Sequence, residues 1–336
     1  MKISIAERLK PFSHLPGAAC IIPGTCWEIE AFPTLLRFGK KIELKLGLTG
    51  PVEEFTLQQD LEKNCVWVFG KAKEGFYRLR IEGSDSGFDL YAEKMPPIPG
   101  PLKAKESFHI GAEVLFISNP AFERLSLGSH KSQDWDQVQR RSDLKEILPI
   151  LFCLGQKIPL IAPQPLTGTA RLLELPTDRN QAASALEAFL KAAFAKILVP
   201  RLTDDDHQGL VPEEAAEGNP SFLLQEGAKL VRSLFFKQNE RRIKFLPHLP
   251  VPLDCGRMTD LKAPGIGTLD LEWSKKLLRR CIVRASTSGE VVVELQSELK
   301  TFRVRTSLKE KGRRQSASEP LLLEAGKSYY LDCFQK

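Results

Sequence analysis

Alternation of hydrophobic and polar residues dominates the first hundred positions. Ile42, Leu44 and Leu46 alternate with charged residues, which is the period of a strand with one buried face. The same period returns over 55–61 and 77–82, while turn-forming residues such as Gly and Pro separate the runs. Five or more short strands at this spacing predict an N-terminal β-sandwich over residues 1–100.

The pattern then changes to one typical of helices. The segment 95–101 holds four prolines and a glycine, cannot pair inside a sheet, and is predicted to be a linker. A helical middle region is expected over 101–230. Asp143 and Glu146 have capping-box spacing, and Pro149 should kink or end the helix that they begin.

The strongest helical pattern covers 180–199, where apolar residues form one wide stripe that Pro200 should end. Before it, the segment 158–176 contains four prolines and predicts a long connection. Asn219 and Pro220 predict the start of a further helix, since Asn is a good N-cap and Pro is tolerated at the first helical position.

Residues 231–336 predict a C-terminal β-sandwich. The runs 233–236 and 242–246 flank a polar turn and predict a hairpin. Leu269, Leu271 and Trp273 then alternate with acidic residues, as in a strand with one buried face. The fold class expected for the whole chain is a β-rich multidomain protein of the α+β type.

Three segments in sequence order resemble family 95 of the glycoside hydrolases, the α-L-fucosidase family. They are Glu217-Gly218-Asn219, Leu246-Pro247-His248-Leu249-Pro250 and Leu269-Asp270-Leu271-Glu272-Trp273. The family has Asp-Gly-Asn-Phe-Gly before the last helix of an (α/α)6 barrel, Leu-Leu-Pro-Ala-Leu-Pro at the end of a hairpin, and Val-Asp-Leu-Glu-Trp at the entrance to a sandwich. The resemblance covers roughly the last third of the chain and implies the end of such a barrel followed by the sandwich.

Glu217 stands where that family places an active-site Asp. The resemblance implies a role in glycosidic bond cleavage, which needs a second carboxyl group or another positioned partner. However, Pro220 and Ser221 replace the family's Phe and Gly. A barrel of about a dozen helices of about 11 residues each also exceeds the room in 101–230. The alternative is that Glu217 is a solvated residue before a helix cap.

The densest polar and aromatic segment covers 129–136. Its candidate ligand-binding residues are His130, Asp134, Trp135 and Asp136, because a ring can stack on a sugar while carboxylates and imidazole bind hydroxyls. In the alternative interpretation, Asp134 or Ser132 caps a helix over 135–148 and Trp135 is its first core contact.

An acidic cluster follows the helix predicted over 180–199. Asp204, Asp205, Asp206 and His207 precede Glu213 and Glu214, and oxygen-rich groups of this kind suit Ca²⁺ or Mg²⁺. The spacing is not that of an EF-hand, so a solvated acidic loop is the favoured interpretation and no metal is predicted.

Charge and composition limit the partners. The net charge is +6, with basic residues gathered late in the chain, where Arg303 and Arg305 alternate with apolar residues on one strand. Nucleic acid is not expected as a partner, because no nucleic-acid motif accompanies this strand. No bilayer-spanning run, secretory signal, disulfide pattern or cofactor motif is found, so a cytoplasmic protein without a cofactor or membrane contact is expected.

Two hypotheses of different class remain after the sequence. The first is a non-catalytic carbohydrate-associated binding or assembly protein, with a carbohydrate or a protein as its partner. The second is an active glycosidase or sugar epimerase with a divergent carboxylate site, for which Glu217 is the catalytic candidate. They differ in whether the middle helices enclose a cleft with converging carboxylates or pack solid against the sheets.

Overall fold

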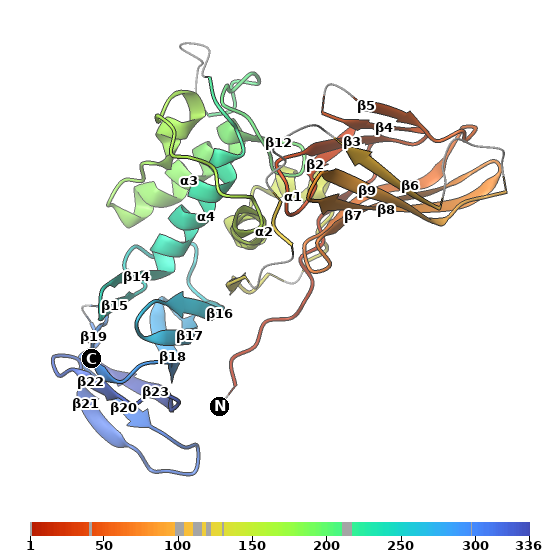
Figure 1. The fold of residues 1–336 in the computed structure, drawn as a ribbon. Helices are drawn as coiled ribbons and strands as arrows, with labels where there is room; N and C mark the ends of the chain where they lie inside the picture. The colour runs from red at the N-terminus through yellow and green to blue at the C-terminus, as the bar shows by residue number, and fades with distance from the viewer. Residues whose placement is uncertain are drawn as a thin grey trace.

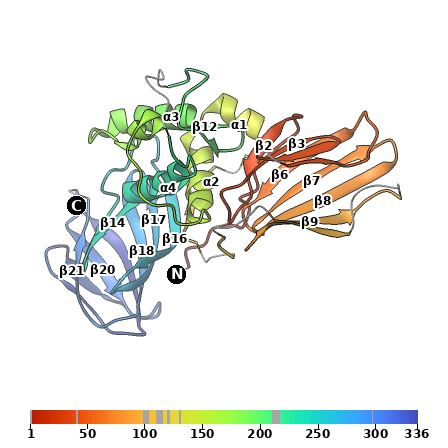
Figure 2. The ribbon, with the colours of Figure 1, turned by 45° about the horizontal axis from the view of Figure 1, so that its top comes forward.

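The computed structural model describes all of the chain apart from residues 1, 40–41, 98–103, 110–115, 119–121, 130, 210–216 and 297. It is strand-rich, with several antiparallel sheets and a smaller helical part, as the sequence predicted. The helices lie between a strand-rich N-terminal part and a strand-rich C-terminal part (Figures 1 and 2).

Two facing sheets form the N-terminal sandwich. The larger has the order β1-β6-β7-β8-β9-β10 and the smaller the order β2-β3-β4-β5. Phe38 of β4 stacks on Phe88 of β9 with ring centroids 3.9 Å apart, which places the core between the sheets. The strands are β1 Phe12–Ser13, β2 Ala18–Ile21, β3 Glu28–Phe32, β4 Leu35–Phe38, β5 Ile42–Lys45, β6 Glu53–Asp60, β7 Cys65–Ala72, β8 Gly75–Ser84, β9 Gly87–Lys94 and β10 Lys105–His109.

The middle of the described chain holds four α-helices. They are α1 Trp135–Arg141, α2 Leu144–Gln156, α3 Arg179–Ala193 and α4 Phe222–Phe235, with a 3₁₀ turn, η1, at Gly168–Leu173. A short pair, β12 Phe194–Ala195 and β13 Val199–Pro200, follows α3. These described helices do not make a barrel of about a dozen helices, and none is long and apolar enough to cross a membrane.

The C-terminal sandwich combines a seven-stranded sheet with a four-stranded one. Their orders are β11-β16-β17-β18-β23-β20-β21 and β14-β15-β19-β22. The strands are β11 Arg124–Ser126, β14 Phe236–Asn239, β15 Arg242–Phe245, β16 Gly256–Ala263, β17 Gly267–Ser274, β18 Leu277–Ala285, β19 Gly289–Glu294, β20 Thr301–Arg305, β21 Arg313–Ser316, β22 Leu321–Leu323 and β23 Ser328–Gln335.

Two predicted helix boundaries are wrong, and for a third, one of the two alternatives is excluded. Pro149, expected to kink or end its helix, lies inside α2 and does not end it, since the helix continues to Gln156. Two helices replace the single one expected over 135–148, because Ser142 adopts a left-handed conformation (φ 48°) between α1 and α2. Helix α3 ends at Ala193, not at Pro200, because Phe194 leaves it to pair with Pro200.

The hairpin and its helix are also displaced from their predicted bounds. Residues 233–235 belong to α4, while the segment 237–239, expected as a turn, is strand β14. Asn219 does accept a hydrogen bond from the backbone N–H of Ser221 (3.0 Å), but the regular helix begins only at Phe222. The tight turn at 219–221 therefore takes the place of the first helical turn that the sequence predicted.

Candidate functional site

A cleft among the described residues opens between α1, α3 and the segment 194–208. Its volume is about 910 Å³, within the size range of natural ligand sites. Polar and charged side chains from all three elements reach it, together with apolar ones. The lining residues include Leu15, Trp135, Asp136, Gln139, Arg140, Glu187, Lys191, Phe194, Leu198, Arg201, Asp206 and Gln208.

The start of α1 sets one wall of this cleft. Asp134 is the N-cap of α1, and its carboxylate accepts hydrogen bonds from the backbone N–H groups of Asp136 (3.1 Å) and Gln137 (3.3 Å). The ring of Trp135 is only 3% exposed, and its indole N–H donates to the carbonyl of Lys196. The capping interpretation is confirmed. Trp135 lies at the edge of the cleft with little exposed surface, so its role as a stacking platform stays a prediction.

Asp136, like Trp135, is a predicted ligand residue that lines the cleft. Its two carboxylate oxygens lie 3.3 and 3.0 Å from the Ser13 hydroxyl, which can donate to one of them. The backbone of Phe12 also forms an isolated β-bridge with Asp134, so the N-terminal sandwich holds the first turn of α1 in place. Asp136 keeps acceptor capacity toward the cleft, since a carboxylate accepts several hydrogen bonds.

The acidic segment after α3 contributes to the opposite wall of the cleft and is held to the end of α3 by Arg201. The Arg201 guanidinium donates to Asp206 (2.6 Å), to Asp204 (3.0 Å) and to two carbonyls at the end of α3. Asp204 is 1% exposed and also accepts from the backbone N–H of Gly209 (2.7 Å). The prediction of a solvated loop is therefore wrong for Asp204, although Asp205, Asp206 and His207 are exposed.

No group of three or more potential metal ligands occurs in the part of the chain that the structure describes. Glu213 and Glu214, which the sequence placed in the same acidic cluster, lie outside that part, as does His130. Both carboxylate oxygens of Asp204 already accept hydrogen bonds, one from Arg201 and the other from the backbone N–H of Gly209.

Two charged residues of the cleft went unnoticed in the sequence. Glu187 and Lys191 lie one turn apart on the same face of α3, and both line the cleft. Neither side chain has a hydrogen-bond or ion-pair partner among the described residues. The polar face of α3 follows from the spacing of its apolar residues, but the sequence does not reveal which segment lies across the cleft from that face.

Glu217 lies apart from these groups. It is exposed and is not among the residues that line the cleft. The next residues are tied elsewhere, since the backbone N–H of Asn219 donates to the Gln164 side chain (3.1 Å). The fold thus does not bring Glu217 together with Asp136, and its catalytic role stays a prediction.

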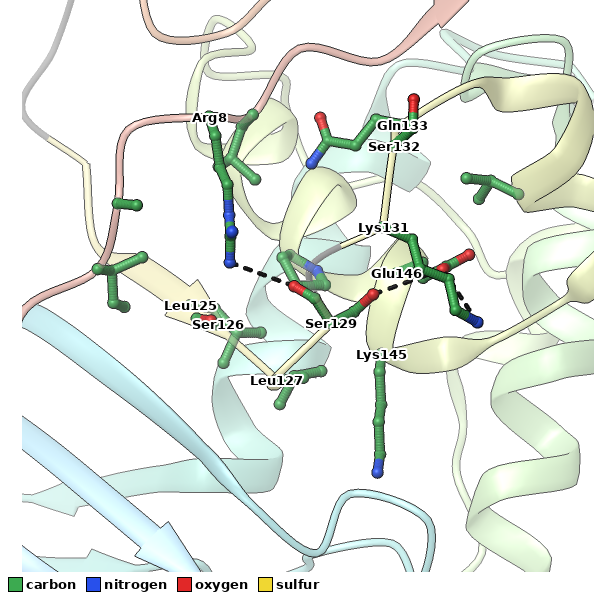
Figure 3. Close-up of a pocket in the computed structure, with 15 residues that line it drawn as sticks. Arg8, Leu125, Ser126, Leu127, Ser129, Lys131, Ser132, Gln133, Lys145 and Glu146 are labelled. Carbon is green, nitrogen blue, oxygen red and sulfur yellow. Dashed lines mark hydrogen bonds and ion pairs between the residues drawn. The ribbon is translucent and has the colours of Figure 1, made fainter.

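A second hollow lies between the N-terminal segment, the chain at 125–133 and α2 (Figure 3). At about 40 Å³ it has room for little more than a water molecule. Ser129 links its two sides by accepting from Arg8 (3.2 Å) at its carbonyl and by a hydroxyl contact to Glu146 (3.4 Å). Glu146 is also paired with Arg141 (2.8 Å), so the polar groups of this small hollow are bonded to one another.

Comparison with known families identifies a relative for the C-terminal part. The family model described as the glycoside hydrolase family 95, C-terminal domain, matches residues 238–331, a range that runs from the β14–β15 hairpin into the last strand. The resemblance found in the sequence is confirmed for this part of the chain. No curated protein matches the chain. The matched range does not include α1, α3 or the segment 194–208, so the cleft must be interpreted from its own residues.

Proposed function

We propose that this chain is a carbohydrate-binding protein whose ligand occupies the cleft between α1 and α3. The observation that carries the proposal is the convergence of Asp136, Glu187 and Gln208 from three separate segments on one open cleft. Sugar hydroxyls both donate and accept hydrogen bonds, so carboxylates and amides are suitable partners for them. Leu15 and Leu198 add apolar surface for the C–H faces of a sugar ring.

The cleft suits binding better than hydrolysis. Glycosidic hydrolysis requires two carboxyl groups that flank the scissile bond. Of the cleft carboxylates, Asp206 is engaged by Arg201 (2.6 Å), and Asp136 lies within hydrogen-bond distance of Ser13. Glu187 is the one carboxylate lining the described cleft that has no protein partner. We therefore infer a binding or assembly role, supported by the similarity of 238–331 to a domain of a glycoside hydrolase family.

A panel of neutral oligosaccharides tests this proposal. The protein should bind at least one of them, and Glu187→Gln and Gln208→Ala should each weaken that binding by about tenfold, the value of one hydrogen bond to a charged or polar partner. Glu319→Gln, at an exposed site in the C-terminal sandwich, is the matched control and should change nothing. An affinity that neither cleft variant changes would refute the assignment.

The same preparations should be assayed on aryl glycosides. We expect no turnover that depends on Glu217, because Glu217 does not line the cleft. Turnover abolished by Glu217→Gln would instead establish the glycosidase alternative. Melting temperatures of all variants should be compared with that of the unmodified protein, so that a loss of binding is not confused with a loss of fold.

A further inference from the structure

A row of charged side chains crosses six strands of the seven-stranded sheet on its outer face. The cross-strand partners, taken in spatial order, are Arg257 on β16, Glu272 on β17, Arg280 on β18, Asp332 on β23, Arg303 on β20 and Arg314 on β21. Neighbours in the strands, such as Leu271 and Leu331, are fully buried. Because side chains alternate along a strand, the charged row faces away from the core.

Each acid of this row is shared by two arginines. Glu272 pairs with Arg257 (3.2 Å) and with Arg280. Asp332 pairs with Arg303 (2.8 Å) and with Arg305, which both lie on β20. One carboxylate neutralises only one guanidinium, so each trio keeps a net charge of +1, held in place by its ion pairs.

The excess of positive charge is greatest at the β20–β21 end. Arg303 lies directly opposite Arg314, and like charges in this position destabilise a sheet. The Arg314 guanidinium donates to the neutral amide of Gln335. The Nε–H of Arg305 is buried and has no acceptor in the described part of the chain. Arg303 and Arg305 therefore share Asp332, while Arg314 beside them has no ion-pair partner among the described residues. An external anion would balance this excess of positive charge.

The geometry points to an acidic polysaccharide with carboxylates on its sugar rings as the partner of this face, and we propose it as such. Guanidinium groups bind carboxylates with two parallel hydrogen bonds. Arginines occupy β16, β18 and β20, with acid-bearing strands between them, so they recur about every 10 Å at the usual strand spacing of about 4.8 Å. A polymer with one charge on every second sugar matches this alternation.

A nucleic acid matches the same face poorly. Duplex DNA carries one charge per about 1.7 Å, so phosphates laid across the sheet would also meet Glu272 and Asp332. Single strands bind through successive aromatic rings, and Tyr330 is the aromatic residue next to Asp332 on this face. The proposal stands on the sheet alone and does not require the cleft to bind a sugar.

Hyaluronan, which has one carboxylate per disaccharide, is the probe for this proposal, with neutral dextran as the uncharged polymer. The test variant combines Arg280→Gln, Arg303→Gln and Arg314→Gln. Glu272 and Asp332 then keep Arg257 and Arg305, so neither acid loses all of its partners. The control variant combines Lys229→Gln, Lys237→Gln and Lys244→Gln, which removes the same charge from exposed sites on α4, β14 and β15.

The full-length protein should be retarded by hyaluronan and not by dextran in affinity electrophoresis at low salt. The arginine variant should lose at least about tenfold in affinity, while the lysine variant stays within about twofold. Equal losses in both variants would show an effect of net charge and overturn the proposal. So would the absence of hyaluronan binding, or tighter binding to single-stranded DNA or dextran sulfate. Failure in the cleft experiments would leave this result unchanged.

Discussion

Arg124 and Glu62 form a bidentate ion pair that joins the two sandwiches. The guanidinium nitrogens lie 2.7 and 2.8 Å from the two carboxylate oxygens, and the side chains are 14% and 8% exposed. Arg124 belongs to β11 at the edge of the C-terminal seven-stranded sheet, whereas Glu62 lies in the turn between β6 and β7 of the N-terminal sandwich. This contact ties the edge of the C-terminal seven-stranded sheet to the N-terminal sandwich.

Replacing Glu62 should therefore destabilise the whole chain. Glu62→Gln leaves the largely buried Arg124 without a counter-charge, and such a change costs about 3 kcal/mol in the free energy of unfolding. The control is Glu43→Gln, which breaks a pair with Arg37 whose side chains are 41% and 58% exposed, and should cost less than about 1 kcal/mol. Urea denaturation measures both, and equal costs would contradict a special role for Glu62.

The same carboxylate predicts a pH dependence. Burial alone would raise the pKa of Glu62, but hydrogen bonds from Arg124 and from the backbone N–H of Leu9 outweigh it and lower that pKa. The folded state therefore gains stability above the unfolded pKa of about 4.3 and loses it as the pH falls through the lower folded value. The difference in stability between the unmodified protein and Glu62→Gln should shrink progressively as the pH falls below about 5; a constant difference would refute this.

Trp273 should be an anchor of the C-terminal sandwich. Its ring is 1% exposed, lies 4.9 Å from the ring of Phe235 in α4, and donates its N–H to the Leu253 carbonyl (3.0 Å). Trp273→Ala should cost about 3 to 5 kcal/mol. Leu322→Ala, at a site 57% exposed, should cost less than about 0.5 kcal/mol. A melting temperature that Trp273→Ala leaves unmoved would disprove the packing.

Trp135 and Asp134 should affect stability more than ligand contact. Trp135→Ala empties a core site and should cost about 3 to 5 kcal/mol. Asp134→Ala removes the N-cap of α1 and should cost about 0.5 to 2 kcal/mol. Trp135→Phe is the matched control, because it keeps most of the ring volume and removes the hydrogen bond to Lys196. If Trp135→Ala kept full stability and lost sugar binding, Trp135 would be a stacking platform for the sugar and not a core residue.

The alternating strands could be predicted because their burial depends on local periodicity. The run Leu269, Leu271 and Trp273 is strand β17, with all three side chains buried. The end of α3 could not be predicted in this way. It depends on Arg201, whose backbone N–H donates to the Ala193 carbonyl (2.8 Å) while its guanidinium binds the Ala192 and Lys191 carbonyls.

Pro149 illustrates the same limit. Local propensity opposes a proline inside a helix, yet its neighbours Leu148 and Ile150 are fully buried. Helix α2 also approaches α4 so closely that a Cβ on Gly155 would lie 2.1 Å from the Leu224 carbonyl oxygen. Packing against α4 therefore outweighs the cost of the proline. The cleft depends on such long-range contacts too, which is why Glu187 could not be picked out in the sequence as a cleft residue.

Amide hydrogen exchange with and without saturating oligosaccharide tests the central claim most directly. Binding in the cleft should slow exchange in peptides that cover 135–141 and 187–208, which come from opposite walls. Peptides from β17 and β18 should exchange at the same rate in both samples. Protection confined to the C-terminal sandwich, or absent from one of the two walls, would contradict the assignment of the carbohydrate site to this cleft.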